Sequence, residues 1–323
     1  MNLYLAFDTS NYTTSAALYD ADRNVVLQQK KLLPVKPGEK GIRQSDAVYH
    51  HTQQLPDVLA ALLEDYKKEY GLVDTADLAD SIRAVGVSTR PRRIDGSYMP
   101  CFTVGMGHAK NIAALLNVPL YEFSHQEGHI AAALYSADRL DLVGQDFLAF
   151  HVSGGTTESL AVHAGKEAPL EADLVGTSSD LKAGQAIDRT GVMLGLAFPA
   201  GPALEQLALQ SERRFKIRPS MKGLNCSLSG VENKCKKMLE EGETPEDIAL
   251  FCLKYVEVSL QAMAEELTSQ YPGQHIVFSG GVMSNGIIRN DFLKTFDCSF
   301  AEPVFSADNA AGVAVLTALQ HNQ

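Results

Sequence analysis

The sequence lacks the features of a secreted or membrane protein. It has 323 residues, no tryptophan and five cysteines without a C-x-x-C pair. It contains no run of about 18 uncharged apolar residues, and its start, MNLYLAFDTS, has no basic segment before the apolar one. These absences argue against a disulfide framework, a cysteine zinc site, a signal peptide and a membrane span. We therefore expect a globular protein of the reducing cytoplasm without a membrane partner.

Positive charge is also scarce, because the formal net charge is -11 and the isoelectric point is near 5.3. Phosphate neutralisation supplies most nucleic-acid affinity, so this balance argues against unaided tight binding of nucleic acid. Basic residues still gather in three segments, at Lys30–Arg43, Arg90–Arg93 and Arg213–Lys222. Such segments are more often solvated loops than binding sites, unless the fold places them on one face.

The most informative feature is an internal repeat. LAFDTSNYTT from Leu5 aligns with LAFHVSGGTT from Leu148, with six identities in ten positions. Each copy reads as an apolar strand, a hydroxyl-rich turn and a second strand, which predicts a hairpin opening each of two similar lobes. This pattern is typical of the two-lobed α/β architecture of actin-like ATPases and sugar kinases, built from duplicated ribonuclease H-like domains. We expect lobes at 1–122 plus 305–323 and at 123–304.

Periodicity predicts the elements that come after each hairpin. We expect strands at 83–89 and 275–281, and helices at 45–66, 101–116, 180–194, 202–210, 231–240, 246–271, from 284 and from 308. The Ser/Thr/Gly turns can present backbone N–H groups and hydroxyls to phosphate oxygens. The pattern G-x-x-x-x-G-K-S/T does not occur, which excludes a P-loop.

Two histidines four residues apart, in SHQEGHIAAAL at 124–134, form the strongest candidate metal site. On a helix His125 and His129 share one face, whereas Glu127 lies roughly 200° around the helix from His125, so the zinc-protease pattern is not met. Asp308, expected to begin the last helix, is the best third ligand. Two imidazoles and one carboxylate suit zinc or ferrous iron. The alternatives are histidines that only line the helix and an aspartate that only caps one.

As a set, the motifs resemble the catalytic subunit of the tRNA threonylcarbamoyladenosine synthase family, long labelled a sialoglycoprotein endopeptidase. They are Asp8-Thr-Ser10, the His125/His129 pair, Val152-Ser-Gly-Gly155, Ala183-Gly-x-Ala-x-Asp188, Gly201-Pro-Ala-Leu204, Ser227-x-Ser-Gly230, Gly280-Gly-Val-x-x-Asn285 and Asp308-Asn-Ala-Ala311. The resemblance implies transfer of a threonylcarbamoyl group from threonylcarbamoyl-AMP to N6 of an adenosine in tRNA.

The resemblance also implies ligands and partners. His125, His129 and Asp308 would bind one divalent metal ion, zinc or iron, and Asp8, Ser10 and Thr13 are the catalytic candidates. An adenine nucleotide (threonylcarbamoyl-AMP, ATP or AMP) would bind Ser153, Gly154, Gly155, Thr156, Gly184, Asp188, Gly201, Gly280, Gly281 and Asn285. Because the chain is acidic, tRNA delivery would need partner proteins, which in this family include a related paralogue and an ATPase.

Several positions depart from the family pattern. Tyr12 and Thr13 replace an acidic pair, and Thr156, Gln185, Ala200 and Glu232 replace a histidine, a glutamate, a glycine and a lysine. A longer loop, Arg90–Tyr98, replaces a Gly-Pro-Gly segment. These changes keep alternatives open: a divergent paralogue that acts on another acceptor, a catalytically impaired scaffold that binds nucleotide and metal, or a small-molecule kinase on the same architecture.

Overall fold

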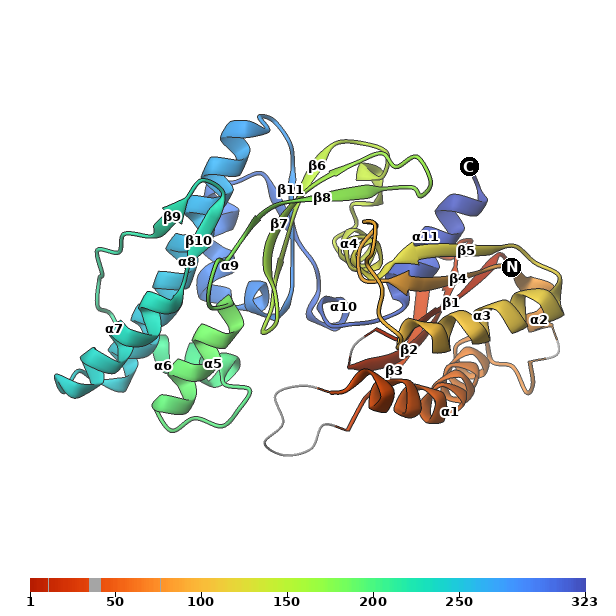
Figure 1. The fold of residues 1–323 in the computed structure, drawn as a ribbon, viewed down its shortest axis with the longest axis horizontal. Coiled ribbons are helices and arrows are strands. Elements are labelled where there is room, and N and C mark those ends of the chain that lie inside the picture. The colour runs from red at the N-terminus through yellow and green to blue at the C-terminus, as the bar shows by residue number, and fades with distance from the viewer. Residues whose placement is uncertain (11, 35–41, 76) are drawn as a thin grey trace. The chain divides into compact units, whose positions relative to one another are not determined.

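The computed structural model describes residues 1–10, 12–34, 42–75 and 77–323. The chain folds into two compact units (Figure 1). Unit 1 comprises Met1–Gly144, His163–Ala172 and Ala307–Gln323, and unit 2 comprises Gln145–Val162 and Asp173–Ser306. Unit 1 includes α4 (His125–Ser136), which packs against α11 (Ala311–His321). The lobe boundaries expected from the sequence stay a prediction. Asn11, and Lys36 and Lys40 of the first basic segment, lie outside the described residues.

Unit 1 is built on a five-stranded sheet in the order β3-β2-β1-β4-β5. The strands are β1 (Leu3–Asp8), β2 (Thr13–Asp20), β3 (Val25–Leu32), β4 (Ile82–Arg90) and β5 (Leu120–Ser124). The hairpin strands pair antiparallel, whereas β1, β4 and β5 run parallel. The carboxyl ends of these parallel strands therefore meet at one edge of the sheet, where Asp8, Arg90 and Ser124 end their strands.

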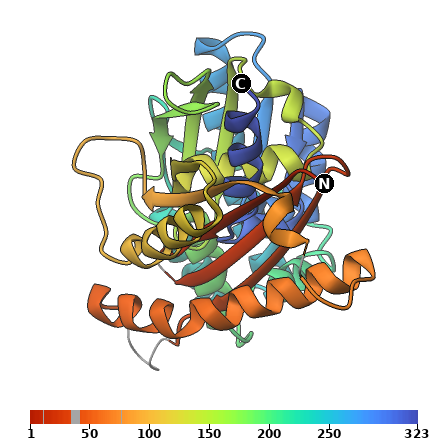
Figure 2. The same ribbon diagram turned by 90° about the vertical axis from the view of Figure 1, so that its right-hand side faces the viewer.

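Helices cover both faces of this sheet (Figure 2). The helices α1 (Gln44–Tyr70) and α3 (Phe102–Leu116) pack on one face, where Val87 contacts Gly105 of α3. The opposite face carries α11, and Gly86 of β4 lies so close to it that an added Cβ would be 1.8 Å from the Thr317 hydroxyl. A short helix, α2 (Leu78–Ser81), precedes β4. This layering brings α11, and the segment before it, next to α4.

Unit 2 carries a second five-stranded sheet, in the order β12-β11-β6-β7-β8. Its strands are β6 (Phe147–Val152), β7 (Thr157–His163), β8 (Glu171–Thr177), β11 (Ile276–Ser279) and β12 (Cys298–Phe300). Its larger helices are α5 (Ala183–Met193), α6 (Gly201–Ala208), α7 (Ser229–Glu240), α8 (Pro245–Gln270) and α9 (Gly286–Thr295). Phe150 and Phe278 of the sheet and Val256 of α8 belong to one buried core. The remaining elements are η1 (Leu140–Leu142) in unit 1 and β9 (Ser220–Lys222), β10 (Asn225–Ser227), η2 (Gly281–Ser284) and α10 (Pro303–Ser306) in unit 2.

The two sheets confirm the internal repeat in detail. In unit 1 the hairpin pairs Leu5 with Leu18 and Asp8 with Ser15. In unit 2 the equivalent pairs are Leu148 with Ala161 and His151 with Glu158, in the same register. In each sheet the opening strand, β1 or β6, pairs antiparallel with the next strand of its hairpin, β2 or β7. On its other side it pairs parallel with β4 or β11, which in turn pairs parallel with β5 or β12. The chain therefore has the expected duplicated ribonuclease H-like topology.

The expected start of the last helix was wrong. The helix α11 begins at Ala311, not Asp308, because Asn309 Oδ1 accepts a hydrogen bond from the Ala311 N–H at 2.9 Å. This side chain satisfies a helix-terminal donor, which leaves the Asp308 carboxylate free of a capping role. Every helix among the described residues is too short or too polar to span a bilayer.

Candidate metal centre and nucleotide pocket

The helix that carries both candidate histidines begins with a capping box. Ser124 Oγ accepts from the Glu127 N–H at 3.2 Å, and Glu127 Oε2 accepts from the Ser124 N–H at 2.6 Å. This reciprocal arrangement satisfies two orphan donors and fixes where α4 starts. It places His125 at the first helical position and His129 one turn later, so that their rings lie 4.3 Å apart between centroids.

Asp308 completes a cluster with the two histidines in unit 1. Its Oδ1 lies 3.2 Å from His129 Nε2 and 3.6 Å from His125 Nε2. One ligand atom from each of the three residues lies within 4.8 Å of the others. The side chains are 19%, 13% and 29% exposed for His125, His129 and Asp308, so the cluster is partly buried yet open to a ligand. The fold thus unites residues that are 179 positions apart in sequence.

Asp8, at the end of β1, binds the ring nitrogen of His125 that faces away from Asp308. The His125 Nδ1–H donates to Asp8 Oδ2 at 2.8 Å, and the other carboxylate oxygen accepts from the Ser10 N–H at 2.7 Å. Asp8 is 1% exposed. Because Nδ1 binds Asp8, Nε2 is the ring nitrogen that faces Asp308, and it would bind a metal ion after losing its own proton. Sequence reasoning missed this contact, because Asp8 and His125 are 117 residues apart.

Electrostatics favours a cation in this cluster. Burial alone would lower the pKa of His125, but the Asp8 charge and the hydrogen bonds with Asp308 and Asp8 raise it to about 10. Burial alone would raise the pKa values of Asp8 and Asp308, yet His125 and hydrogen bonds from Ser10 hold the pKa of Asp8 below its ordinary value. His125 and His129 hold the pKa of Asp308 well below its ordinary value. Two carboxylates flanking imidazoles therefore stay ionised. This donor set fits a divalent ion of the zinc or ferrous type.

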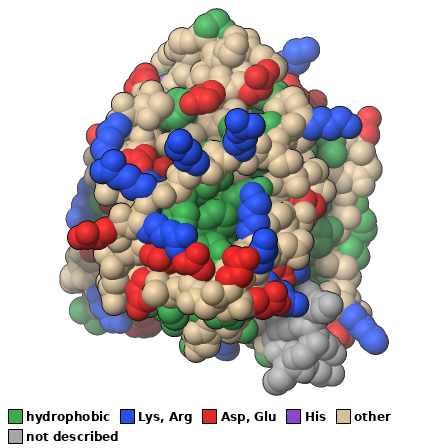
Figure 3. Space-filling view, turned by 90° about the vertical axis from the view of Figure 1, so that its left-hand side faces the viewer, with side chains coloured by type: hydrophobic (Ala, Val, Ile, Leu, Met, Phe, Trp, Pro, Cys, Tyr) green, Lys and Arg blue, Asp and Glu red, His purple; other side chains and the backbone are tan. Residues whose placement is uncertain are grey.

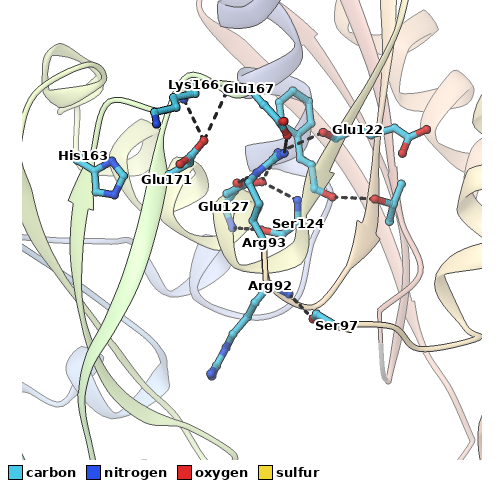
Figure 4. A network of polar contacts seen from close by, with 12 residues as sticks. Arg92, Arg93, Ser97, Glu122, Ser124, Glu127, His163, Lys166, Glu167 and Glu171 are labelled. Carbon is cyan, nitrogen blue, oxygen red and sulfur yellow. Dashed lines mark hydrogen bonds and ion pairs between the residues drawn. The ribbon is translucent and has the colours of Figure 1, made fainter. Parts of the chain in front are cut away.

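A polar network joins the start of α4 to the loop Arg90–Tyr98 (Figure 4). Arg93 donates from Nε to Glu127 Oε1 at 2.5 Å and from Nη2 to Glu127 Oε2 at 3.1 Å. It also contacts Glu167, at 3.1 Å, in the segment between β7 and β8. Glu127 is 2% exposed and is committed to Arg93 and to the capping box. These contacts give Glu127 a structural role and leave the protease interpretation without support.

Unit 2 contains a cavity of about 300 Å³, at the lower end of the range for small-molecule sites. Six of the predicted nucleotide residues line it: Gly154, Gly184, Asp188, Gly201, Gly281 and Asn285. Its lining also includes Ile187, Pro199, Pro202, Glu205, Val282 and Ser284. The cavity therefore combines an apolar wall with a few polar groups and the N-terminal regions of α5 and α6.

Glycine allows the close approach that forms this cavity. A Cβ on Gly184 would lie 2.6 Å from the Gly154 backbone nitrogen, so α5 can meet the turn between β6 and β7 only without a side chain there. The Gly184 N–H donates to Ser153 O at 3.2 Å. Gly280 has φ of +95°, and a Cβ on it would lie 2.2 Å from Val152 O. Both positions bring backbone to the edge of the cavity.

The remaining predicted nucleotide residues form the adjoining turns. The Ser153 N–H donates to Thr156 O at 2.7 Å, and the Thr156 N–H donates to Ser153 Oγ at 3.2 Å. Gly155 lies between them and Gly280 precedes η2. None of these four lines the cavity among the described residues. Their role in nucleotide binding stays a prediction.

Sequence reasoning missed Glu205, which comes directly after the Gly201-Pro-Ala-Leu motif. Its Oε1 accepts from the Gly286 N–H at 2.7 Å and links α6 to α9 beside the cavity. Asn285 Oδ1 caps α9 through the Ile287 and Ile288 N–H groups. Asp188 Oδ1 accepts from the Ala200 N–H at 2.8 Å. The sequence signal that could have identified Glu205 is an acidic residue one turn after Gly201, where the helix begins.

Comparison with known proteins agrees with this geometry. A model of the TsaD family, tRNA N6-adenosine threonylcarbamoyltransferase, matches residues 23–315. The tRNA N6-adenosine threonylcarbamoyltransferase of Brachyspira hyodysenteriae is 30% identical over 97% of this chain and 89% of its own length. A probable bifunctional tRNA threonylcarbamoyladenosine biosynthesis protein of Methanothermobacter thermautotrophicus is 25% identical over 97% of this chain, which spans 55% of that protein.

Solved structures show the same fold. Component A of the Acidaminococcus fermentans (R)-2-hydroxyglutaryl-CoA dehydratase aligns over 100% of both chains, with a TM-score of 0.57 and 14% identity. That likeness, together with the duplicated sheets, confirms the predicted α/β architecture of the actin-like ATPase class. The family match extends over most of the chain, including the histidine pair and the glycine turns. The chain therefore belongs to the tRNA N6-adenosine threonylcarbamoyltransferase family.

Proposed function

We propose that this chain transfers a threonylcarbamoyl group from threonylcarbamoyl-AMP to N6 of an adenosine in tRNA. The observation that carries the proposal is the His125–His129–Asp308 cluster, formed within one unit of a chain that belongs to this family. The kinase alternative would leave the histidine pair without a purpose, and the family match favours the transferase over an impaired scaffold.

The reaction divides between two sets of residues. His125, His129 and Asp308 would hold one zinc or ferrous ion, which when bound supplies a Lewis acid for the oxygens of the acyl group. The glycine-rich cavity of unit 2 would hold the adenylate, with Asp188 and Asn285 as its polar contacts. The N-terminus of α5 lies at this cavity, where its helix dipole would favour a negatively charged phosphate, while its Ala183 and Gly184 N–H groups donate to Thr157 Oγ1 and Ser153 O.

The chemistry requires little beyond positioning and proton removal. The exocyclic N6 amine attacks the carbamoyl carbon, the carbon–oxygen bond to the phosphate breaks, and AMP leaves with the electron pair. The amine loses one proton, which a base or water accepts. Asp8 is bonded to His125 and Ser10, so we assign it the role of orienting His125. The catalytic roles of Ser10 and Thr13 remain predictions.

We further propose that partner proteins assist tRNA delivery. The net charge of -11 gives the chain as a whole little attraction for a polyanion. A paralogue and an ATPase of the family are the expected partners. A cytoplasmic location also stays a prediction.

The test is mass spectrometry of tRNA nucleosides, together with AMP release, after incubating metal-analysed protein with threonylcarbamoyl-AMP and unmodified tRNA. We expect threonylcarbamoyladenosine with the wild-type protein and its loss in Asp308→Ala. Asp57→Ala is the matched control, because Asp57 is an exposed aspartate of α1. Bound metal and nucleotide without any product from the wild-type protein, with and without the family partners, would reject the transferase.

A further inference from the structure

The third basic segment, Arg213–Lys222, shows an alternation that composition alone does not reveal. Arg214, Lys216, Arg218 and Lys222 are exposed, and we call these four residues the basic row. Phe215, Ile217, Pro219 and Met221, which lie between them, are partly buried. An alternation of period two places the basic side chains on one face of the segment, with neighbours about 7 Å apart where the backbone is extended.

The inner side chains fix this segment on unit 2. The Phe215 ring lies 5.2 Å from the Phe251 ring of α8, and Ile217 and Met221 pack against the core of the unit. Lys222 ends β9, which pairs antiparallel with β10. The backbone that carries the basic row is therefore fixed by packed side chains. It need not become ordered when a ligand binds, which lowers the entropic cost of binding.

The row carries positive charge that the protein does not neutralise. Arg213, the first residue of the segment, forms ion pairs with Glu243 and Asp247. Among the described residues, no member of the basic row forms an ion pair or a side-chain hydrogen bond. In a chain with a net charge of -11, four unpaired cations in one short segment favour an anionic ligand with repeated charges.

The hairpin formed by β9 and β10 is tied to the nucleotide cavity within the same unit. Asn225 of β10 accepts through Oδ1 from the Thr177 N–H at 2.9 Å, at the end of β8. Ser227 and Ser229 donate to the Asp180 carboxylate at 2.5 and 2.6 Å, three residues before α5. Because α5 carries Gly184 and Asp188 of the cavity, the basic row and the cavity share one framework.

The surface on the side that carries β9 and α7 has basic, acidic and hydrophobic side chains close together. Figure 3 shows the side on which β9 and α7 lie in Figure 1, where Lys and Arg side chains gather around a hydrophobic patch and Asp and Glu side chains border part of it. A row of cations suits a phosphate backbone better than it suits a compact anion, because successive phosphates can each take one cation.

We propose that the basic row binds the sugar-phosphate backbone of the tRNA substrate. This inference rests on the proposed function, since that function supplies the RNA. The row recognises no base, so it contributes affinity and orientation rather than sequence selection. The match to the family model does not show which surface of the chain would bind tRNA.

The experiment measures binding of labelled, unmodified tRNA by fluorescence anisotropy over a salt series from about 50 to 200 mM. The test variant replaces Arg214, Lys216, Arg218 and Lys222 with glutamine. The control variant makes the same charge change at Lys68, Lys110, Lys166 and Lys294, which are exposed elsewhere on the chain. We expect the row variant to bind tRNA at least about tenfold more weakly, with a salt slope lower by about 3, and the control to change little.

A second readout separates this proposal from the proposed function. Metal content and AMP binding should be unchanged in the row variant, because neither site includes these residues. Equal tRNA affinity and equal salt slope in wild type and row variant would overturn the basic row, even if the wild type still forms threonylcarbamoyladenosine. Loss of binding to an acidic protein partner without any change for tRNA would also overturn it. A wild-type protein that binds no tRNA at low salt would do the same.

Discussion

The two copies of one hairpin carry different chemistry at equivalent positions. In unit 1 the strand ends in Asp8, which binds His125, whereas the register of unit 2 places His151 there, with its Nδ1 3.0 Å from Ser279 Oγ. The backbone pairing is the same in both copies. The difference lies in the segments after the neighbouring parallel strands: a histidine helix after β5 in unit 1, and glycine-rich segments after β11 in unit 2. A shared scaffold thus carries the candidate metal site in one unit and the candidate nucleotide cavity in the other.

His129→Ala should have the largest effect, because it should remove the metal from unit 1 while AMP still binds to unit 2. Removing one of three ligands from the cluster leaves two donors, too few for a stable zinc or iron site. We expect metal content to fall from about one ion per chain to near zero and transferase activity to fall by at least about 100-fold. AMP binding to unit 2, measured by calorimetry, should be unchanged. His108→Ala, a half-buried histidine of α3, is the control. Full metal stoichiometry in His129→Ala would contradict the triad.

Asp8→Asn should weaken the metal site without removing a ligand. The amide keeps the shape of the side chain but loses the charge that favours the Nδ1–H form of His125. We expect metal affinity to fall by about 10- to 100-fold, measured by competition with a chelator. Asp57→Asn serves as the control. Unchanged affinity would show that Asp8 does not orient His125 and would leave it a catalytic candidate.

Gly184→Ala should affect only the site in unit 2. The added methyl would lie 2.6 Å from the Gly154 nitrogen, so α5 or the turn between β6 and β7 must move. We expect AMP affinity to fall about tenfold and metal content to stay at the wild-type level, since tight contacts of this kind typically cost about 1–3 kcal/mol, about 5- to 150-fold. Gly107→Ala on α3 is the control, because a Cβ there meets no atom of the described residues within 4 Å and the residue belongs to unit 1. Equal loss in both variants would argue against a specific steric effect.

Sequence reasoning reached the duplicated fold because each hairpin keeps a short-range pattern of apolar strands and hydroxyl-rich turns. It also found the histidine pair, which a single helix places on one face. It missed the Asp8–His125 contact and the Arg93–Glu127 anchor, since both join segments that only the sheet order brings together. It placed the last helix three residues too early, because an aspartate and an asparagine at 308 and 309 are equally good caps by sequence. It did not identify β3, β5, β8 or β12, whose short or partly polar strands give weak periodicity.

The smallest expected effect concerns Glu257, a buried carboxylate of unit 2 that can be compared with Asp8 of unit 1. Glu257 of α8 is 3% exposed, like Asp8, but burial raises its pKa to about 7 despite a contact with Lys254 at 2.8 Å. The folded state therefore holds this proton more tightly than the unfolded state, whose glutamate pKa is near about 4.3. The associated stability is fully present below about pH 4 and is lost as the pH rises through about 7, with a slope of up to about 1 kcal/mol per pH unit.

Urea denaturation at a series of pH values between about 5 and 8 measures this contribution. Glu257→Gln cannot ionise, so its unfolding midpoint should fall less with rising pH than that of the wild type. Glu265→Gln, an exposed position on the same helix, should keep the wild-type dependence. Parallel curves for Glu257→Gln and wild type would show that Lys254 keeps Glu257 ionised at neutral pH. The two units would then treat buried carboxylates alike, each held charged by a cationic neighbour, and the contrast between them would rest on the metal ligands and the glycines alone.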